Sequence, residues 1–183
     1  MSRPTPLLVL GLGNLLLEDD GIGAAAVALL LDRYEIPQEV SVLDGGTLGL
    51  SLLPYLEDAE VVILVDAVQT DQAPGSFVRL DGDDVMPAVA TRLSPHQVGV
   101  ADLLDGARWL ERYPARLVLL GLVPDSMELA VGLSPRVRPA LMDLVNRIVD
   151  EARSLGFVFE AKSTYETPAA DSPVDVARLA GMR

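Results

Sequence analysis

Apolar runs of strand length alternate along the chain with longer segments that favour helices. The runs at 6–12, 61–68 and 116–124 are apolar almost throughout, which is typical of strands buried on both faces of a parallel sheet. A shorter run at 40–47 carries valines at alternate positions and also favours a strand. The run at 76–82 predicts a further strand, which we place at an edge of the sheet.

Four segments between and after these strands have the composition or the spacing of helices. They lie at 21–34, 48–58, 95–113 and 135–155. The third is preceded by Ser94, a good helix cap, and begins with Pro95, which is favoured in a first turn. The last has apolar residues at helical spacing and is expected to end at Gly156. Residues 83–93 show neither pattern and are interpreted as irregular.

The resulting order, β-α-β-α-β-β-α-β-α, is that of an α/β protein. We therefore predict a three-layer αβα sandwich with a mostly parallel, twisted sheet of about five strands. A chain of 183 residues is long enough for one domain with a sizeable core. We expect this domain to span 1–160, because the composition then shifts to Ala, Pro, Ser, Thr and Asp, and 161–183 to form a mobile tail.

The chain carries 27 acidic and 14 basic residues, which gives a net charge of −13. This balance argues against nucleic-acid binding and suits metal cations or a basic partner. The absence of cysteine excludes disulfides, thiolate metal sites and a cysteine nucleophile. The apolar N-terminal stretch resembles a signal peptide, but Gly11, Gly13 and Asn14 interrupt it, and no run reaches the roughly 18 residues of a membrane span. We expect a cytoplasmic monomer without membrane insertion.

Glycines at the end of the first strand raise the question of a nucleotide-binding loop. Gly11 and Gly13 follow the strand, but the third glycine of the dinucleotide fingerprint would fall on Leu16. The acidic run at 18–20 comes next and would repel a pyrophosphate. Nucleotide binding is therefore not expected.

Acidic residues instead follow three of the predicted strands. Asp20, Asp44 and Asp66 would share one edge of a parallel sheet, and a right-handed connection would bring His96, the only histidine, to the same edge. Carboxylates with an imidazole suit nickel, zinc, manganese or iron(II). Ordinary structural roles fit as well, since Asp44 before two glycines can shape a turn and the acids at 18–20 can favour a helix N-terminus. The spacing alone leaves both interpretations open.

Four sequence segments, taken together, resemble one enzyme family. They read GLGNLLLEDDGIG at 11–23, LDGGTLGLSLLPYLEDAEVVILVDAVQ at 43–69, SPHQVGVADLL at 94–104 and ARLVLLGLVPDSMELAVGLSP at 115–135. The set is similar to the hydrogenase maturation endopeptidases, which trim the C-terminus of the large subunit of nickel–iron hydrogenases. Each segment alone is a weak signal, but the combination is specific and covers about residues 6–155.

The resemblance implies a site, residue by residue. The family's metal ligands correspond to Asp20, Asp66 and His96, and the aspartate implicated in its activity corresponds to Asp44. Some members carry glutamate where this chain has Asp20. The metal implied is nickel, supplied by the substrate.

The resemblance also implies a reaction, the removal of the C-terminal extension from the [NiFe] hydrogenase large-subunit precursor. No serine, threonine or cysteine nucleophile is evident, so we expect attack by water, with Asp44 or a carboxylate freed from the metal as the general base. Two alternatives stay open. One is a metallohydrolase that holds its own ion, and the other is a non-proteolytic nickel-binding chaperone for the precursor.

Overall fold

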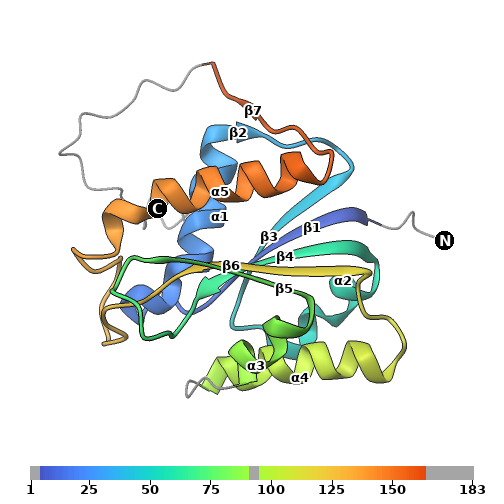
Figure 1. Cartoon of the computed structure of the whole chain (residues 1–183), viewed down its shortest axis with the longest axis horizontal. Coiled ribbons are helices and arrows are strands. Elements are labelled where there is room, and N and C mark those ends of the chain that lie inside the picture. The colour runs from blue at the N-terminus through green and yellow to red at the C-terminus, as the bar shows by residue number, and fades with distance from the viewer. Residues whose placement is uncertain (1–4, 91–94, 164–183) are drawn as a thin grey trace.

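A five-stranded sheet forms the middle layer of the molecule (Figure 1). The computed structural model describes residues 5–90 and 95–163, and at 90 and 95–98 it describes the backbone alone. In the spatial order β3-β1-β4-β6-β5, the strands span Val40–Gly46, Thr5–Leu12, Ala59–Ala67, Arg116–Leu122 and Phe77–Asp81. Only the edge strand β5 runs antiparallel to its neighbour. The predicted α/β fold with a mostly parallel sheet is confirmed.

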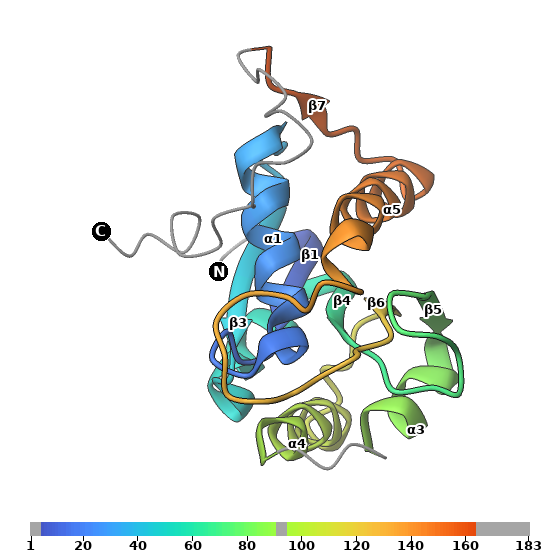
Figure 2. The same ribbon diagram turned by 90° about the vertical axis from the view of Figure 1, so that its left-hand side faces the viewer.

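Helices cover both faces of this sheet (Figures 1 and 2). On one face lie α1 and α5, which span Ile22–Arg33 and Leu141–Ser154. On the other lie α2, α3 and α4, which span Leu53–Glu57, Val85–Ala90 and Pro95–Trp109. Because successive strand side chains point to opposite faces, the central strands contribute to both hydrophobic clusters. None of the described helices combines the length and apolar composition needed to cross a membrane.

Small residues allow α1 to lie close against the sheet. Eight of its twelve residues are buried. At Gly23 an added Cβ atom would lie 2.1 Å from the carbonyl oxygen of Val65 and 2.4 Å from that of Leu12, so only glycine permits this approach. The contact brings the start of α1, and the acidic turn before it, onto the ends of β1 and β4.

Short elements connect the main ones. The 3₁₀ helices η1, η2, η3 and η4 span Glu18–Gly21, Gly49–Leu52, Gly82–Asp84 and Arg138–Ala140. A separate two-stranded ladder pairs β2, Tyr34–Glu35, with β7, Glu160–Ala161. It ties the end of α1 to the chain beyond α5. The predicted tail lies almost wholly outside the described residues.

Two predicted helices begin later than expected, because prolines limit where an α-helix can begin. The last α-helix begins at residue 141 and not at 135, since Pro139 lies in the preceding 3₁₀ turn. The helix predicted at 48–58 divides into η2 and the five-residue α2, with Pro54 in the first turn of α2. The helix predicted at 95–113 is present as α4 but ends at Trp109, and its predicted cap, Ser94, lies outside the described residues.

The interpretation of 83–93 as irregular was wrong for its first part. This segment forms η3 and then α3. Val85 and Val89, four residues apart, place their side chains in the core beneath the sheet. The helix is only six residues long, too short to produce a clear periodic pattern.

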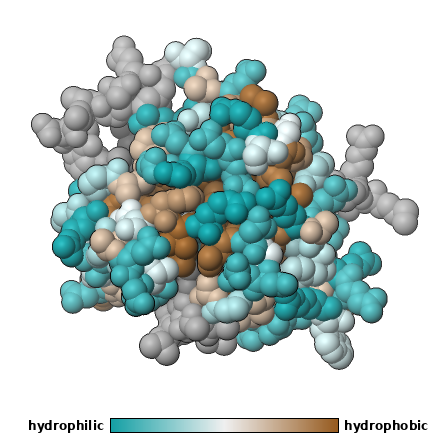
Figure 3. Space-filling model, viewed as in Figure 1, coloured by the Kyte–Doolittle hydropathy of each residue, from teal (hydrophilic) through white to brown (hydrophobic). Residues whose placement is uncertain are grey.

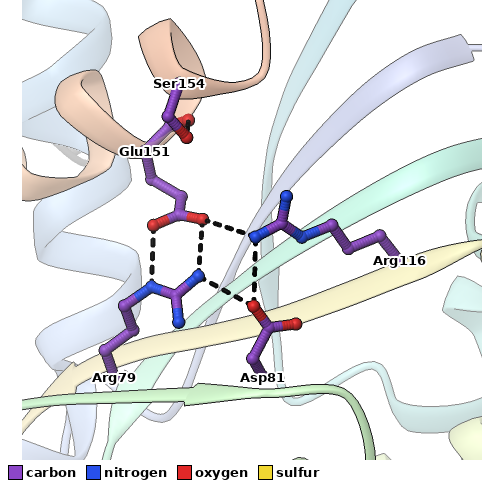
Figure 4. A network of polar contacts seen from close by, with 5 residues as sticks. All are labelled: Arg79, Asp81, Arg116, Glu151 and Ser154. Carbon is purple, nitrogen blue, oxygen red and sulfur yellow. Dashed lines mark hydrogen bonds and ion pairs between the residues drawn. The ribbon is translucent and has the colours of Figure 1, made fainter.

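Charged residues fasten the edge strand β5 to α5 (Figure 4). Arg79 donates two hydrogen bonds to the carboxylate of Glu151, at 2.8 and 2.9 Å, and one to Asp81 at 2.9 Å. Arg116 of β6 donates to Asp81 at 3.0 Å. On this side of the molecule, hydrophilic surface interrupts a hydrophobic band (Figure 3). Charges of this kind protect an edge strand from pairing with another chain.

Candidate active site

The acids singled out in the sequence lie at the carboxyl ends of neighbouring parallel strands. Asp44 of β3 is paired in register with Gly11 of β1, and Asp66 of β4 is paired with Gly121 of β6. Strands β1, β3, β4 and β6 run in the same direction (Figure 1). Both aspartates, near the carboxyl ends of their strands, therefore lie at one edge of the sheet. Ligands of open α/β sheets bind at this edge.

The two strand aspartates lie on opposite faces of the sheet. Asp66 alternates with Leu64 and Val68, whose side chains pack in the cluster beneath α4. Asp44 alternates with Val42, which packs in the cluster beneath α1. The sequence predicts that Asp44 and Asp66 share an edge of the sheet. It does not predict that they lie on opposite faces.

Asp66 is almost completely buried, with 1% of its surface exposed. The backbone N–H of Ala67 donates to its Oδ1 at 2.7 Å. The strand beside it carries Gly121, where an added Cβ atom would lie 2.1 Å from the carbonyl oxygen of Asp66. The side chain of Asp66 is thus oriented by the N–H of Ala67, and its backbone packs tightly against β6.

Asp20 reaches the same edge from η1, which contacts the end of β4. Its side chain is fully buried, and its Oδ2 accepts a hydrogen bond of 2.8 Å from the backbone N–H of Asn14. This turn requires Gly13, whose φ is +114° and where an added Cβ atom would lie 1.8 Å from the carbonyl oxygen of Asp20. Glycine at 13 therefore lets the chain after β1 fold back and return Asp20 to the strand ends.

His96 belongs to the first turn of α4, and its side chain lies outside the described residues. The backbone of this part of α4 lies against the start of η2, which follows β3, since an added Cβ atom at Gly99 would come 3.1 Å from the Cα atom of Gly49. α4 thus begins at the same edge as the acids (Figure 1). Among the side chains that the structure describes, no three His, Asp or Glu residues are arranged to hold a metal ion. The side chain of His96 is not among them, so the predicted trio remains a prediction.

Asp44 is exposed to solvent and lines a pocket of about 220 Å³. Gly13, Asn14 and Ala24 also line this pocket. The Oδ1 of Asp44 accepts a hydrogen bond of 3.0 Å from the N–H of Gly46, so the residue shapes the turn after β3 as the sequence suggested. An exposed carboxylate beside a pocket at the strand ends can also accept a proton from water.

Asp19, next to Asp20, has a role that the sequence reasoning missed. Its carboxylate is fully buried and accepts hydrogen bonds from three backbone N–H groups, those of Asp125, Ser126 and Ser134, at 2.8–3.1 Å. The acidic run therefore does more than favour a helix start, because Asp19 holds the distant 124–134 loop. Its partners lie more than a hundred residues away, and no local pattern could have revealed them.

The same two segments are also joined through their backbones. The N–H of Ala130 donates to the carbonyl oxygen of Leu16 at 3.1 Å, and the N–H of Glu18 donates to that of Ala130 at 3.0 Å. A bridge pairs Leu17 with Ala130 in parallel. Figure 2 shows the 124–134 loop in orange beside the turn that follows β1 in blue. Both loops therefore border the site as one unit.

Comparison with known proteins identifies the family. The model of the hydrogenase maturation protease family (HycI) matches residues 25–151. The chain belongs to the hydrogenase maturation proteases. It is 36% identical over 151 residues to the hydrogenase 2 maturation protease of Escherichia coli, covering 82% of this chain and 92% of that protein. It is 37% identical over 172 residues to the hydrogenase expression/formation protein HupD of Rhodobacter capsulatus, covering 92% and 81%.

Solved structures agree with this assignment. The hydrogenase maturating endopeptidase HybD from E. coli has a TM-score of 0.83 and 35% identity, covering 87% of this chain and 99% of that one. The [NiFe] hydrogenase maturation protease HybD from Thermococcus kodakarensis has a TM-score of 0.66 and 26% identity, covering 80% and 99%. The protein is therefore a peptidase, and its buried acids, pocket and joined loops can be considered as parts of a peptide-bond hydrolase.

Proposed function

We propose that this protease removes the C-terminal extension of a [NiFe] hydrogenase large-subunit precursor and recognises nickel already bound by that substrate. The observation that carries the proposal is the burial of two carboxylates, Asp20 and Asp66, at one edge of the sheet. The ends of parallel strands are where α/β sheets bind ligands, and carboxylate oxygens are suitable ligands for a divalent cation. A cation brought by the substrate would find two carboxylates at this edge.

The donor chemistry of the chain fits nickel. Asp20 and Asp66 offer carboxylate oxygens, and His96 at the start of α4 offers an imidazole nitrogen. Imidazole and carboxylate together suit a borderline divalent ion. We assign these three residues to complete the coordination of the substrate's nickel. A bound metal ion polarises a nearby carbonyl group, which would favour hydrolysis there.

Asp44 is our candidate for the general base. It is exposed beside the pocket and lies on the other face of the sheet from Asp66, which suits a role separate from metal binding. In this reaction the oxygen of a water molecule bonds to the scissile carbonyl carbon, and Asp44 accepts the water proton. The proton then passes to the leaving nitrogen as the C–N bond breaks. The products are the processed subunit, with a new carboxylate end, and the released peptide.

We further propose that the protease acts in the cytoplasm as a monomer. The absence of cysteine fits a reducing compartment.

Mass spectrometry of the precursor, with and without nickel, tests the proposed function. The nickel-loaded precursor should lose its C-terminal peptide, and the nickel-free precursor should remain intact.

Asp66→Asn and His96→Ala should abolish cleavage while keeping the fold, and Asp44→Asn should lower kcat more than it weakens nickel binding. Asp58→Asn, a substitution of an exposed aspartate at the opposite edge, is the matched control.

Full cleavage by Asp66→Asn or His96→Ala would refute the residue assignment. The metal content of the purified protease separates the proposal from a metallohydrolase with its own ion. One tightly held ion per chain would contradict recognition of the substrate's nickel.

A further inference from the structure

Four apolar side chains on the two joined segments that border the site are exposed to solvent. Leu16, Met127, Leu129 and Val131 expose 55%, 37%, 82% and 67% of their surfaces. Leu16 belongs to the turn after β1, and the other three belong to the 124–134 loop. We call these four residues the apolar platform. Single exposed apolar residues are ordinary, but several on joined segments are typical of a binding surface.

The backbone holds the apolar platform in place. Ala130, between Leu129 and Val131, is hydrogen-bonded through its N–H to Leu16 and through its carbonyl oxygen to Glu18. The carboxylate of Asp19 fixes both ends of the loop, at Asp125 and Ser126 and at Ser134. A surface that is already ordered loses little conformational entropy when a partner binds.

The apolar platform is continuous with the candidate active site. The N–H of Asp20 donates to the carbonyl oxygen of Leu17 at 3.0 Å, and Leu17 is paired with Ala130 of the loop. An extended polypeptide advances about 3.3–3.6 Å per residue. A substrate chain cleaved at this edge therefore has residues within reach of the platform only a short distance from the cut bond.

Building on the proposed function, we propose that the apolar platform binds an apolar segment of the precursor close to the cleaved bond. The occupant is a polypeptide because a peptidase has to hold a polypeptide at this edge. Aliphatic side chains recognise other apolar side chains by removing both from water. With a net charge of −13, the protease also disfavours an acidic segment here. The platform thus selects the substrate by the apolar side chains of the substrate segment. This selection acts in addition to any recognition of the substrate's metal.

The test uses Leu129→Ser, Val131→Ser and the double variant, with the nickel-loaded precursor as substrate. Cleavage kinetics and the Kd for the precursor are measured in parallel. The controls are Leu110→Ser and Val158→Ser, which change residues of 47% and 57% exposure after α4 and after α5. We expect the double variant to raise KM and Kd by about tenfold or more, because two buried aliphatic contacts are lost. Its kcat and thermal midpoint should stay at the wild-type values, and the controls should change neither KM nor Kd.

Wild-type KM and Kd in the double variant would overturn the proposal, and so would a fall in kcat alone. Sedimentation of the free proteins gives a further check. If the wild type is a dimer and the double variant a monomer, the platform is a surface for self-association and not for substrate. If the wild-type protease leaves the precursor intact, the proposed processing reaction fails, while the Kd values still decide the role of the platform.

Discussion

Asp19 and Asp20 are neighbours in the chain, but their carboxylates make different contacts. Asp19 accepts hydrogen bonds from the distant 124–134 loop, whereas Asp20 accepts one from Asn14 in the turn just before it. Both side chains are fully buried, so burial alone does not distinguish a structural aspartate from a candidate ligand. Their hydrogen-bond donors differ, because those of Asp19 belong to the distant loop and that of Asp20 belongs to the neighbouring turn. Substitutions at 19 and at 20 should therefore separate stability from catalysis.

Asp19→Ala should lower the free energy of unfolding by about 2–4 kcal/mol, because three backbone N–H groups lose their acceptor. Urea denaturation measures this loss. Asp125→Ala is the matched control in the same loop, since its carboxylate forms an exposed ion pair with Arg136. Asp125→Ala should lower the free energy of unfolding by less than about 1 kcal/mol. Equal losses in the two variants would show that Asp19 does not hold the loop.

At the scale of elements, the charged network joins β5, β6 and α5 into one edge. Burial alone would raise the pKa of Asp81, but hydrogen bonds from Arg79 and Arg116 outweigh it and lower this pKa below its usual range. The hydrogen bonds from Arg79 to Glu151 and Asp81 also raise the pKa of the Arg79 guanidinium. Both groups therefore stay charged at neutral pH, and the edge is held by ion pairs.

The lowered pKa of Asp81 predicts a pH-dependent contribution to stability. This contribution is present above the unfolded-state pKa of about 3.9 and is lost as the pH falls through the lower folded-state pKa. At pH 7, Asp81→Asn should be less stable than the wild type by less than about 1 kcal/mol, since the pair is partly exposed. Thermal melts between pH 7 and pH 2 should show the two proteins converging below about pH 4. A difference that stays constant with pH would contradict this account.

Much of the element order could be predicted because the relevant signals are local. A strand buried on both faces, such as 61–68, is visible as a continuous apolar run. The ends of such strands also predict where Asp44 and Asp66 lie, because parallel strands end at one edge. Gly156, which ends the last helix with a φ of +95°, was predicted from its type alone.

The remaining features depend on partners that are remote in the sequence. The bonds of Asp19 to the 124–134 loop, and the pairing of β2 with β7, join segments more than a hundred residues apart. Nor does the sequence reveal that Asp44 and Asp66 lie on opposite faces of the sheet, because that depends on the register of two strands separated by β1. These relations follow from packing and not from local preference.

At the scale of the whole molecule, the segment after α5 closes one end of the core. Phe159 is only 3% exposed and packs in the cluster shared by α1 and α5. The N–H of Lys162 then donates to the carbonyl oxygen of Arg33 at 2.9 Å. Contacts with the rest of the domain therefore extend at least to Lys162.

Phe159→Ala should therefore lower the free energy of unfolding by about 3–5 kcal/mol, as expected for a large side chain removed from a core. Val158→Ala, at the exposed neighbouring position, should change it by less than about 0.5 kcal/mol. Chemical denaturation of both variants gives the comparison. Similar values for the two would mean that the segment after α5 contributes little to the core.

The joining of the 124–134 loop to the turn after β1 also limits how the protease can open. A lid must move while the catalytic groups stay in place, but here the turn that would have to stay includes Asp20 itself. Lifting the loop would break its bonds to Leu16 and Glu18 and displace the acid that it borders. This side of the site is therefore a fixed wall against which a substrate must fit without displacing it.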